Sequence, residues 1–510
     1  MSRIWQGVSK LRLPNIKIQH LWTLAVMAGI ILFLNTHPIR PHDFWWHITI
    51  GKEILNQGEI PSYDAYSYTM PGQPYPAYQM FWLMEIGLYL VYQLGGPELI
   101  VFTNTLVIGL AYGLVLFTSF RVSSSWRIAA FTTLFAAALG MNDWNVRPQV
   151  ITFLIGASFM WSIYYLREKP RWVLVSIFPL GMLVWANSHG SFPIGLVMIG
   201  IWLADELWKL LRGGLAGITM AAFRGVSMPL AAIILTALAV LINPRGIGIW
   251  SYVMNLTSDP AVQNLVTEWA PPTFNTLGGV IFLASLMGSA MLLAFSPRRP
   301  DVFQMLTFLI FGILGLKTTR GSVWFGILMA PVLAVHIQAL VKKPDSDEMD
   351  VKTESGSVTI NWIFTALLIG MVIISLPWFK ERLPLPEAKA GLISSETPVE
   401  AVRFLTEHKL PAPVFHAMSY GSYMIWAAQP DYKVFVDPRI ELYPLSIWKD
   451  YYTISNVQSS WEERLGDYGI QTLLINPLEQ SGLANQVSAS AEWVRVYEDA
   501  ITQIYTRSHP

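Results

Sequence analysis

The stretch RPHDFWWHITIGKEILNQGEIPSYDAYSYTMPGQPYPAYQMFWLMEIG, residues 40–87, combines acidic groups, aromatic rings and turn residues in one segment. It follows an apolar run at 21–37 that is close to the length of a membrane span. Four basic residues precede that run, and no small-residue cleavage site follows it. We therefore predict a retained anchor at 21–37 and a long loop, residues 38–97, beyond the membrane.

Further apolar runs recur along the chain. Of its 510 residues, 53% are hydrophobic and only 13% are charged, whereas an average soluble domain carries roughly 25% charge. This pattern predicts a mainly α fold, a multi-pass transmembrane helical bundle with about eleven spans. The predicted spans are 21–37, 98–120, 128–143, 149–166, 172–186, 191–211, 226–242, 277–295, 302–316, 322–341 and 361–379.

The distribution of Lys and Arg orients these spans. With the N-terminus in the cytoplasm, five inner loops carry basic clusters and the outer segments carry few. We therefore predict an inner-membrane protein whose outer segments are 38–97, 143–148, 187–190, 243–276, 317–321 and everything after 380. Residues 78–95 are apolar, but a carboxylate, Glu85, lies in their middle and is costly in lipid. We expect 78–95 to follow the outer interface or dip into a cavity.

The chain after the last span loses the membrane pattern. In residues 385–510, PVFHA, YKVFVD, TLLIN, WVRVYED and ITQIYTR are typical of short strands, with helix-like segments between them. This alternation predicts a small α/β domain with a partly parallel sheet, on the extracytoplasmic side. Residues 1–380 are the predicted membrane domain, and the polar stretch 343–360 is a predicted cytoplasmic linker within it.

Composition and motifs exclude several function classes. Thirty-four basic and 34 acidic residues cancel, and no signature of nucleic-acid binding is present. The chain has no cysteine, so it has no thiolate nucleophile or thiolate metal site. It also lacks a Walker loop, a dinucleotide fingerprint, a GxSxG elbow and an HExxH motif. Nucleotide-driven transport and the use of soluble nucleotide sugars therefore lack support.

Acidic residues of the long loop are the candidate catalytic groups. Asp43 comes directly after the anchor, where a carboxylate can accept a proton from a hydroxyl or bind a divalent cation, Mg²⁺ or Mn²⁺. Together with His42 and His47 it is a candidate metal site; the alternative is that Asp43 only caps a helix. Asp64 is the second candidate, and its alternative role is to cap a turn.

Cationic residues in the outer segments are candidate ligands for a phosphate. A guanidinium binds phosphate oxygens in pairs, although an Arg at a span end also reaches toward lipid headgroups. The donor-phosphate candidates are Arg147, His189, Lys317 and Arg320. The candidate substrate or loop contacts are Trp45, Trp46, His47, Glu85, Asn187 and Glu268. We expect Asp43, Asp64, Asp143, Arg147, His189, Glu268, Lys317 and Arg320 to share one water-facing surface.

These groups suit one kind of reaction. The extracytoplasmic side has no ready supply of ATP or nucleotide sugars, so a group-transfer enzyme there needs a donor delivered through the membrane. A polyprenyl-phosphate-linked sugar meets that need. Its transfer requires a carboxylate near the interface, cations for the phosphate and aromatic rings for the sugar.

The arrangement resembles that of the GT-C glycosyltransferases, the superfamily of protein mannosyltransferases, oligosaccharyltransferases and lipid A aminoarabinose transferases. The chain is similar over nearly its whole length to an uncharacterised bacterial group of GT-C-like proteins. The shared motifs are DFWWH (43–47), GEIP (58–61), DAYSYT (64–69), RPQ (147–149), WANSHG (185–190), NPRG (243–246), EWAPP (268–272), YGSYMIW (420–426) and VFVDPRIELY (434–443).

This resemblance implies a sugar transfer from a polyprenyl-phosphate donor to an acceptor glycan, lipid or protein, with Asp43 as base or metal ligand. The chain lacks the adjacent Asp-Glu pair of the mannosyltransferases and the WWD-type motif of the oligosaccharyltransferases, so sugar and acceptor stay open. Two alternatives also stay open. One is a transporter or flippase of a lipid-linked carrier, and the other is a non-catalytic assembly or binding subunit.

Overall fold

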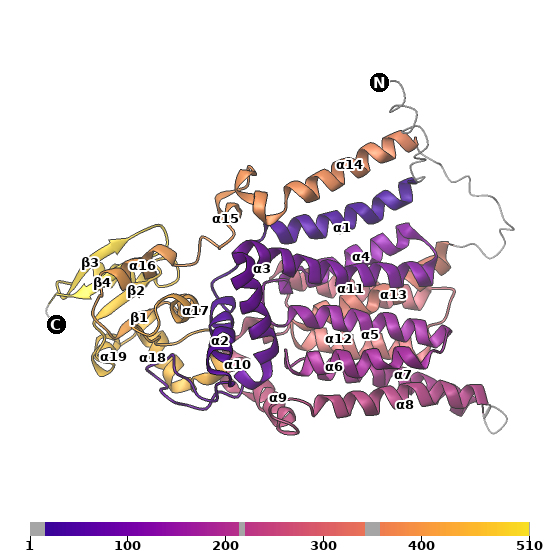
Figure 1. Cartoon of the computed structure of the whole chain (residues 1–510), viewed down its shortest axis with the longest axis horizontal. Coiled ribbons are helices and arrows are strands. Elements are labelled where there is room, and N and C mark those ends of the chain that lie inside the picture. Colours follow the sequence, from indigo (N-terminus) through magenta and orange to yellow (C-terminus); the bar gives the residue numbers. More distant parts are fainter. Residues whose placement is uncertain (1–15, 214–219, 342–356, 509–510) are drawn as a thin grey trace.

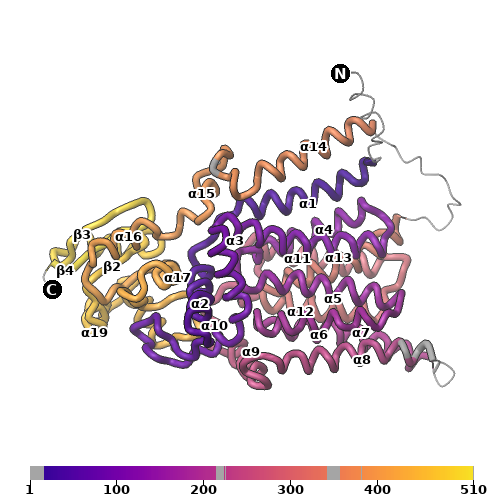
Figure 2. The backbone as a smooth tube through the Cα atoms, in the orientation of Figure 1, coloured from indigo at the N-terminus to yellow at the C-terminus, as the bar shows by residue number. Residues whose placement is uncertain are grey.

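The computed structural model describes residues 16–213, 220–341 and 357–508. Long helices run side by side in a bundle, and a small α/β domain lies beyond one end of it (Figures 1 and 2). The short helices α2 (Phe44–Gln57), α9 (Gly248–Ser258) and α10 (Pro260–Leu265) lie between the two parts. The segments predicted to be extracytoplasmic thus gather at the end that faces the α/β domain.

Each of the eleven predicted spans is helical. The bundle consists of α1 (Ile18–Thr36), the second half of α3 (Tyr78–Ser123), α4 (Trp126–Gly140), α5 (Val150–Glu168), α6 (Ile177–Ala186), α7 (Pro193–Arg212), α8 (Met220–Val240), α11 (Leu277–Phe295), α12 (Val302–Lys317), α13 (Gly321–Val341) and α14 (Val358–Ile374). Five helices of the described chain are long and apolar enough to cross a membrane, and four shorter ones are apolar. The count of eleven crossings stays a prediction. Most of the predicted linker 343–360 lies outside the described residues.

Helix α3 changes direction at Gly95 and Gly96, whose backbone angles are not helical. Gly96 has a φ of 62°, a conformation that glycine adopts without steric cost. The first half of α3, residues 78–94, lies across the end of the bundle beside α2, and the second half runs along it (Figure 1). At Gly51 of α2, a Cβ atom would lie 2.0 Å from the carbonyl oxygen of Glu85, so the two helices touch at backbone distance.

The α/β domain contains a four-stranded sheet in the order β1-β2-β4-β3. Strands β1 (Val414–His416) and β2 (Thr472–Ile475) are parallel, and β4 (Gln503–Arg507) is antiparallel to both β2 and β3 (Trp493–Glu498). The helices of this domain are α16 (Val399–Glu407), α17 (Met418–Ala427), α18 (Leu445–Ser455), α19 (Trp461–Asp467) and α20 (Ser481–Ser488).

The predicted strand YKVFVD at 432–437 is wrong. Its backbone does not join the sheet but pairs with the long first loop, where Val434 N donates to Tyr66 O at 2.9 Å and Tyr68 N donates to Val434 O at 3.1 Å. The residues favour extended backbone, but their partner is a segment almost 370 residues away rather than a neighbouring strand. This pairing attaches the first loop to the α/β domain.

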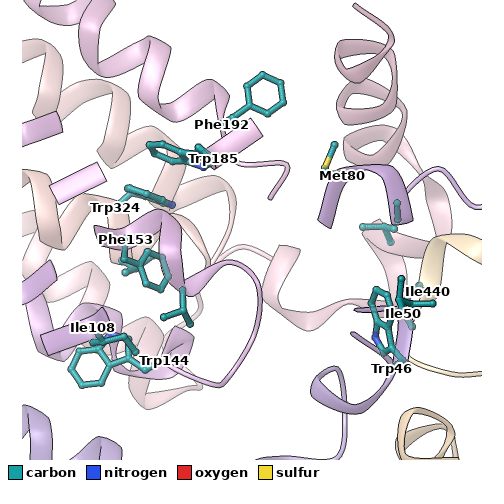
Figure 3. Packing of buried hydrophobic residues seen from close by; sticks show 14 of the residues in the cluster. Trp46, Ile50, Met80, Ile108, Trp144, Phe153, Trp185, Phe192, Trp324 and Ile440 are labelled. Atoms are coloured by element: carbon teal, nitrogen blue, oxygen red, sulfur yellow. The ribbon is translucent and has the colours of Figure 1, made fainter. Parts of the chain in front are cut away.

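Buried aromatic residues fill the bundle and the junction with the α/β domain. Trp185 and Trp324 stack with ring centroids 5.4 Å apart inside the bundle, while Trp46 and Ile50 of α2 lie beside Ile440 at the junction (Figure 3). Apolar burial is thus continuous from the bundle into the α/β domain.

Candidate functional site

A cavity of about 580 Å³ opens where the bundle meets the first loop. Its walls are the end of α1, the start of α2, α3, the segment after α4 and the loop at 267–268. Lys389, on the connector between α14 and the α/β domain, also reaches it. Besides His42, a candidate metal ligand, three candidate site residues line this cavity, namely Asp43, Arg147 and Glu268.

These three residues belong to a chain of ion pairs. Asp43 Oδ2 lies 2.7 Å from Arg147 Nε, and Arg147 Nη1 donates to both carboxylate oxygens of Glu268, at 2.9 and 3.0 Å. On the other side, Arg320 Nε donates to Glu268 Oε2 at 2.7 Å. Two carboxylates and two guanidinium groups alternate, so the chain has no net charge.

Asp43 does not cap α2 with its side chain, which was the alternative to a catalytic or metal-binding role. It occupies the N-cap position of α2, but its side chain makes no capping hydrogen bond. One carboxylate oxygen holds Arg147, and within the described residues the other, Oδ1, has no partner. The side chain is 21% exposed, so this oxygen is available to a molecule in the cavity.

Burial and charge set the protonation of the neighbouring groups. Burial by itself raises the pKa of Glu268, but the charges of Arg320 and Arg147 outweigh it and lower that pKa to about 2. For Asp143, in the turn after α4, burial raises the pKa to about 7, and the charge of Glu268 adds to this. Near neutral pH, Glu268 is therefore ionised, while Asp143 is poised between its two forms.

The raised pKa of Asp143 predicts a pH-dependent stability. The protonated form is favoured by folding, so its contribution is complete below the ordinary pKa of 3.8 and is lost as the pH rises to about 7. We expect Asp143→Asn to unfold at a higher temperature than the wild type at pH 8, by an amount worth at most a few kcal/mol. Thermal unfolding of the purified protein at pH 5, 6, 7 and 8 measures this difference.

The advantage of Asp143→Asn should grow from pH 5 to pH 7 and stay constant above it. Asp431→Asn, at an exposed carboxylate of the α/β domain, is the matched control and should follow the wild type. A constant offset between Asp143→Asn and the wild type at all four pH values would contradict the assignment.

A narrow apolar groove adjoins the cavity. It lies at the bend of α3, lined by Met84 and Leu88 before the bend and Ile100 and Val107 after it. Asn104, Val146 and Arg147 line both the groove and the cavity. An apolar chain in the groove would therefore place its polar end beside Arg147.

Solved structures with a similar fold exist. The archaeal oligosaccharyltransferase AglB from Archaeoglobus fulgidus, in complex with an inhibitory peptide and a dolichol-phosphate, matches with a TM-score of 0.53 and 12% identity, over 96% of this chain and 74% of that one. ArnT from Cupriavidus metallidurans in the apo state matches with a TM-score of 0.51 and 12% identity, over 94% of this chain and 96% of that one. This chain has the GT-C fold.

The GT-C fold confirms the architecture that the sequence motifs implied, and together with the apolar helices it supports an integral, multi-pass membrane protein. At 12% identity the likeness is one of fold. No family model and no curated protein matches the chain in sequence.

His189 and Asn187 lie in the turn between α6 and α7, next to the first half of α3. Asn187 bridges elements, because its Nδ2 donates to Leu183 O and Ile242 O, both at 2.8 Å, and its Oδ1 accepts from Trp82. Burial, with the charges of Arg320 and Arg147, lowers the pKa of His189 to about 3. Its ring is therefore neutral at pH 7 and carries no charge for a phosphate.

His47 and Glu85 form a buried pair, with His47 Nδ1 2.9 Å from Glu85 Oε1. They link α2 to α3 behind Asp43, and neither lines the cavity. Trp45 packs against Tyr423 and Trp426 of α17, so it joins α2 to the α/β domain. Trp46 is also buried, against His47.

Asp64 lies in a different cluster from Asp43. Its oxygens accept from the backbone of Tyr66 and Ser67, as the turn alternative predicts, and Oδ1 lies 2.6 Å from Arg439 Nη1. Both charged side chains are fully buried. Lys317 is exposed at the end of α12 and does not line the cavity, while Arg320 reaches it only through Glu268.

Sequence reasoning missed several polar residues of the cavity wall. Arg40 and His37 come directly before the DFWWH motif, so their position was a usable signal. Nothing local distinguishes Asn104 in the middle of an apolar run or Lys389 on the connector. The missed polar residues of the wall are His37, Arg40, Asn104, Asn142, Asn145, Thr267 and Lys389.

The predicted metal ligands do not come together. The described residues contain no group of three or more His, Asp or Glu side chains that could hold a metal ion. His47 is paired with Glu85, and the guanidinium of Arg147 lies between the carboxylates of Asp43 and Glu268, where a bridging cation would sit. Arg147 thus takes the place of a cation shared by the two carboxylates, and the metal site at Asp43 stays a prediction.

Proposed function

We propose that this protein is an inverting glycosyltransferase that moves a sugar from a polyprenyl-phosphate donor to an extracytoplasmic acceptor. One observation carries the proposal: in a GT-C fold, the carboxylate of Asp43 faces a polar cavity that adjoins an apolar groove at Arg147. The groove has the apolar lining that an isoprenoid chain requires, and the cavity has room for a sugar and an acceptor group.

In the proposed reaction, the free Oδ1 of Asp43 accepts the proton of an acceptor hydroxyl. The hydroxyl oxygen then forms a bond to the anomeric carbon as the bond from that carbon to the phosphate oxygen breaks. The lipid phosphate leaves with the electron pair of the broken bond. Arg147 holds the other oxygen of Asp43 in an ion pair, which leaves Oδ1 for the acceptor.

The fold of AglB was solved with a dolichol-phosphate, which supports a polyprenyl carrier for this chain too. We propose that the cavity end of the bundle faces the extracytoplasmic side of the inner membrane and that the N-terminus lies in the cytoplasm. The α/β domain, attached to the first loop through Val434, would then present or select the acceptor.

The proposed function is tested by measuring cleavage of the lipid-linked donor and transfer of its sugar. Purified protein is incubated with polyprenyl-phosphate-linked sugars of several kinds, and release of the free polyprenyl phosphate is measured together with transfer to added glycan, lipid and protein acceptors. Release that requires an acceptor supports the proposal. Movement of the intact donor across vesicle membranes without cleavage would instead support a flippase, and no change in the donor would support a binding subunit.

The chemistry of the donor set predicts how the enzyme responds to chelation. Because Arg147 supplies the positive charge between Asp43 and Glu268, we expect EDTA to lower transfer by less than about twofold, whereas removing a catalytic metal costs several kcal/mol of barrier stabilisation. Transfer rates before and after EDTA, with Mg²⁺ or Mn²⁺ added back, are the measurement. A loss that either cation restores would favour the predicted metal site at Asp43.

A further inference from the structure

Basic side chains gather on the wall of the cavity formed by α1 and the connector. Arg40 and His37 follow α1, and Lys389 lies in α15 (Glu387–Ala390); all three line the cavity. Lys380, in the 3-10 turn η6 (Pro377–Arg382), is near enough to His37 and Lys389 for their charges to interact. The cluster thus combines the two ends of the membrane domain.

Lys380 is buried without a partner. Its exposed fraction is 0%, and its Nζ has no hydrogen-bond partner within the described residues. Burial lowers the pKa of Lys380 to about 8, and the charge of Lys389 adds to this. A buried ammonium with no partner among the described side chains is costly, and a bound anion removes that cost.

The cluster also has no carboxylate partner among the side chains that the structure describes. In the part of the chain that the structure describes, Arg40, Lys380 and Lys389 form no ion pair with Asp or Glu, whereas Arg147 and Arg320 both hold Glu268. The cavity-lining cations without a described carboxylate partner are therefore Arg40 and Lys389, with the buried Lys380 near them, rather than the two arginines that the sequence suggested.

Backbone contacts hold the cluster in place. The connector pairs with the chain after α1, where Ile39 N donates to Leu392 O at 2.8 Å and Ser394 N donates to Ile39 O at 2.9 Å. One turn earlier, Asn35 Nδ2 donates to Ser375 Oγ at 3.1 Å. Arg40 and the two lysines are therefore fixed relative to each other by elements on both sides.

We propose that Arg40, Lys380 and Lys389 form an anion subsite that binds the phosphate group of a membrane lipid. Arg and Lys are the usual ligands of phosphate, through paired guanidinium bonds and through ammonium charge. Two lipids share this chemistry, the polyprenyl phosphate carrier and a bilayer phospholipid. Binding of the polyprenyl phosphate carrier rests on the proposed function, whereas binding of a bilayer phospholipid is independent of it.

The experiment measures lipid binding by the purified full-length chain in neutral detergent. Undecaprenyl phosphate is compared with undecaprenol, and phosphatidylglycerol with diacylglycerol, so each pair differs in its phosphate. We expect the phosphate-bearing member of at least one pair to raise the unfolding temperature of the wild type. In Lys380→Met, the unfolding temperature without lipid should be higher than in the wild type, and the lipid should bind about tenfold or more weakly.

A second variant shows whether weaker binding in Lys380→Met comes from misfolding. Arg40 and Lys389 are exposed, so the double variant Arg40→Gln, Lys389→Gln should fold normally and also bind about tenfold or more weakly. The matched control is Lys317→Gln, an exposed cation outside the cavity, which should bind as the wild type does.

The comparison of the two lipid pairs identifies which lipid occupies the subsite. Binding of undecaprenyl phosphate alone assigns the subsite to the carrier, binding of phosphatidylglycerol alone assigns it to a headgroup, and binding of both supports the shared chemistry. Wild-type affinity for both lipids in Lys380→Met and in the double variant would overturn the subsite. Asp43→Asn should bind lipid as the wild type does. If the wild type binds the carrier but never transfers sugar, the subsite stands and the proposed function is contradicted.

Discussion

Asp43→Asn is expected to lower sugar transfer by about 10²- to 10⁴-fold, the usual contribution of a positioned general base. Asparagine has the same shape as aspartate, and its side-chain oxygen can still accept from Arg147, but it cannot take the proton of the acceptor hydroxyl. The measurement is the rate of release of polyprenyl phosphate by purified protein, at saturating donor and acceptor.

The matched control for this result is Glu59→Gln, which changes an exposed carboxylate of the same first loop and should leave the rate unchanged. Unfolding temperature and donor affinity, measured for both variants, separate a chemical effect from a structural one. An Asp43→Asn protein that transfers sugar at the wild-type rate would remove Asp43 from the mechanism.

Arg439→Met is expected to destabilise the junction between the first loop and the α/β domain by about 3–5 kcal/mol. Arg439 is fully buried, and its Nη1 lies 2.6 Å from Asp64 Oδ1 while its Nη2 lies 2.6 Å from Asp437 Oδ2. It also donates to the hydroxyl of Tyr78 at 2.5 Å. Methionine fills a similar volume but leaves two buried carboxylates without a counter-charge.

The loss should appear as a lower denaturant midpoint of the purified protein and as faster proteolysis within residues 391–508. Arg403→Met is the matched control, because Arg403 pairs with Glu400 on the surface of the same domain, with side chains 57% and 61% exposed. Such surface pairs contribute about 0–1 kcal/mol. Equal losses in the two variants would show that the buried cluster does not hold the junction.

The sequence by itself determined the helices of the bundle. A segment that crosses lipid must satisfy its backbone internally, so each span requires an apolar helical run, and such runs are visible without any knowledge of their neighbours. The eleven predicted segments are all helical for this reason. Local sequence patterns also placed Asp43 just after the first anchor. They predicted the sheet strands at 414–416, 472–475, 493–498 and 503–507.

Only the tertiary structure decided which polar groups meet. Glu268 lies 121 positions after Arg147, and the partner of Asp64 lies 375 positions away, so no local pattern reveals either pair. The segment 432–437 favours extended backbone, but its hydrogen-bond partner was fixed by the docking of the first loop rather than by the sheet. Lys380 and Lys389 follow the last span, and the pairing of Ile39 with the connector brings them to the first. A side chain's neighbours across the fold depend on how the helices pack, and that is set by many weak contacts together rather than by any one stretch of residues.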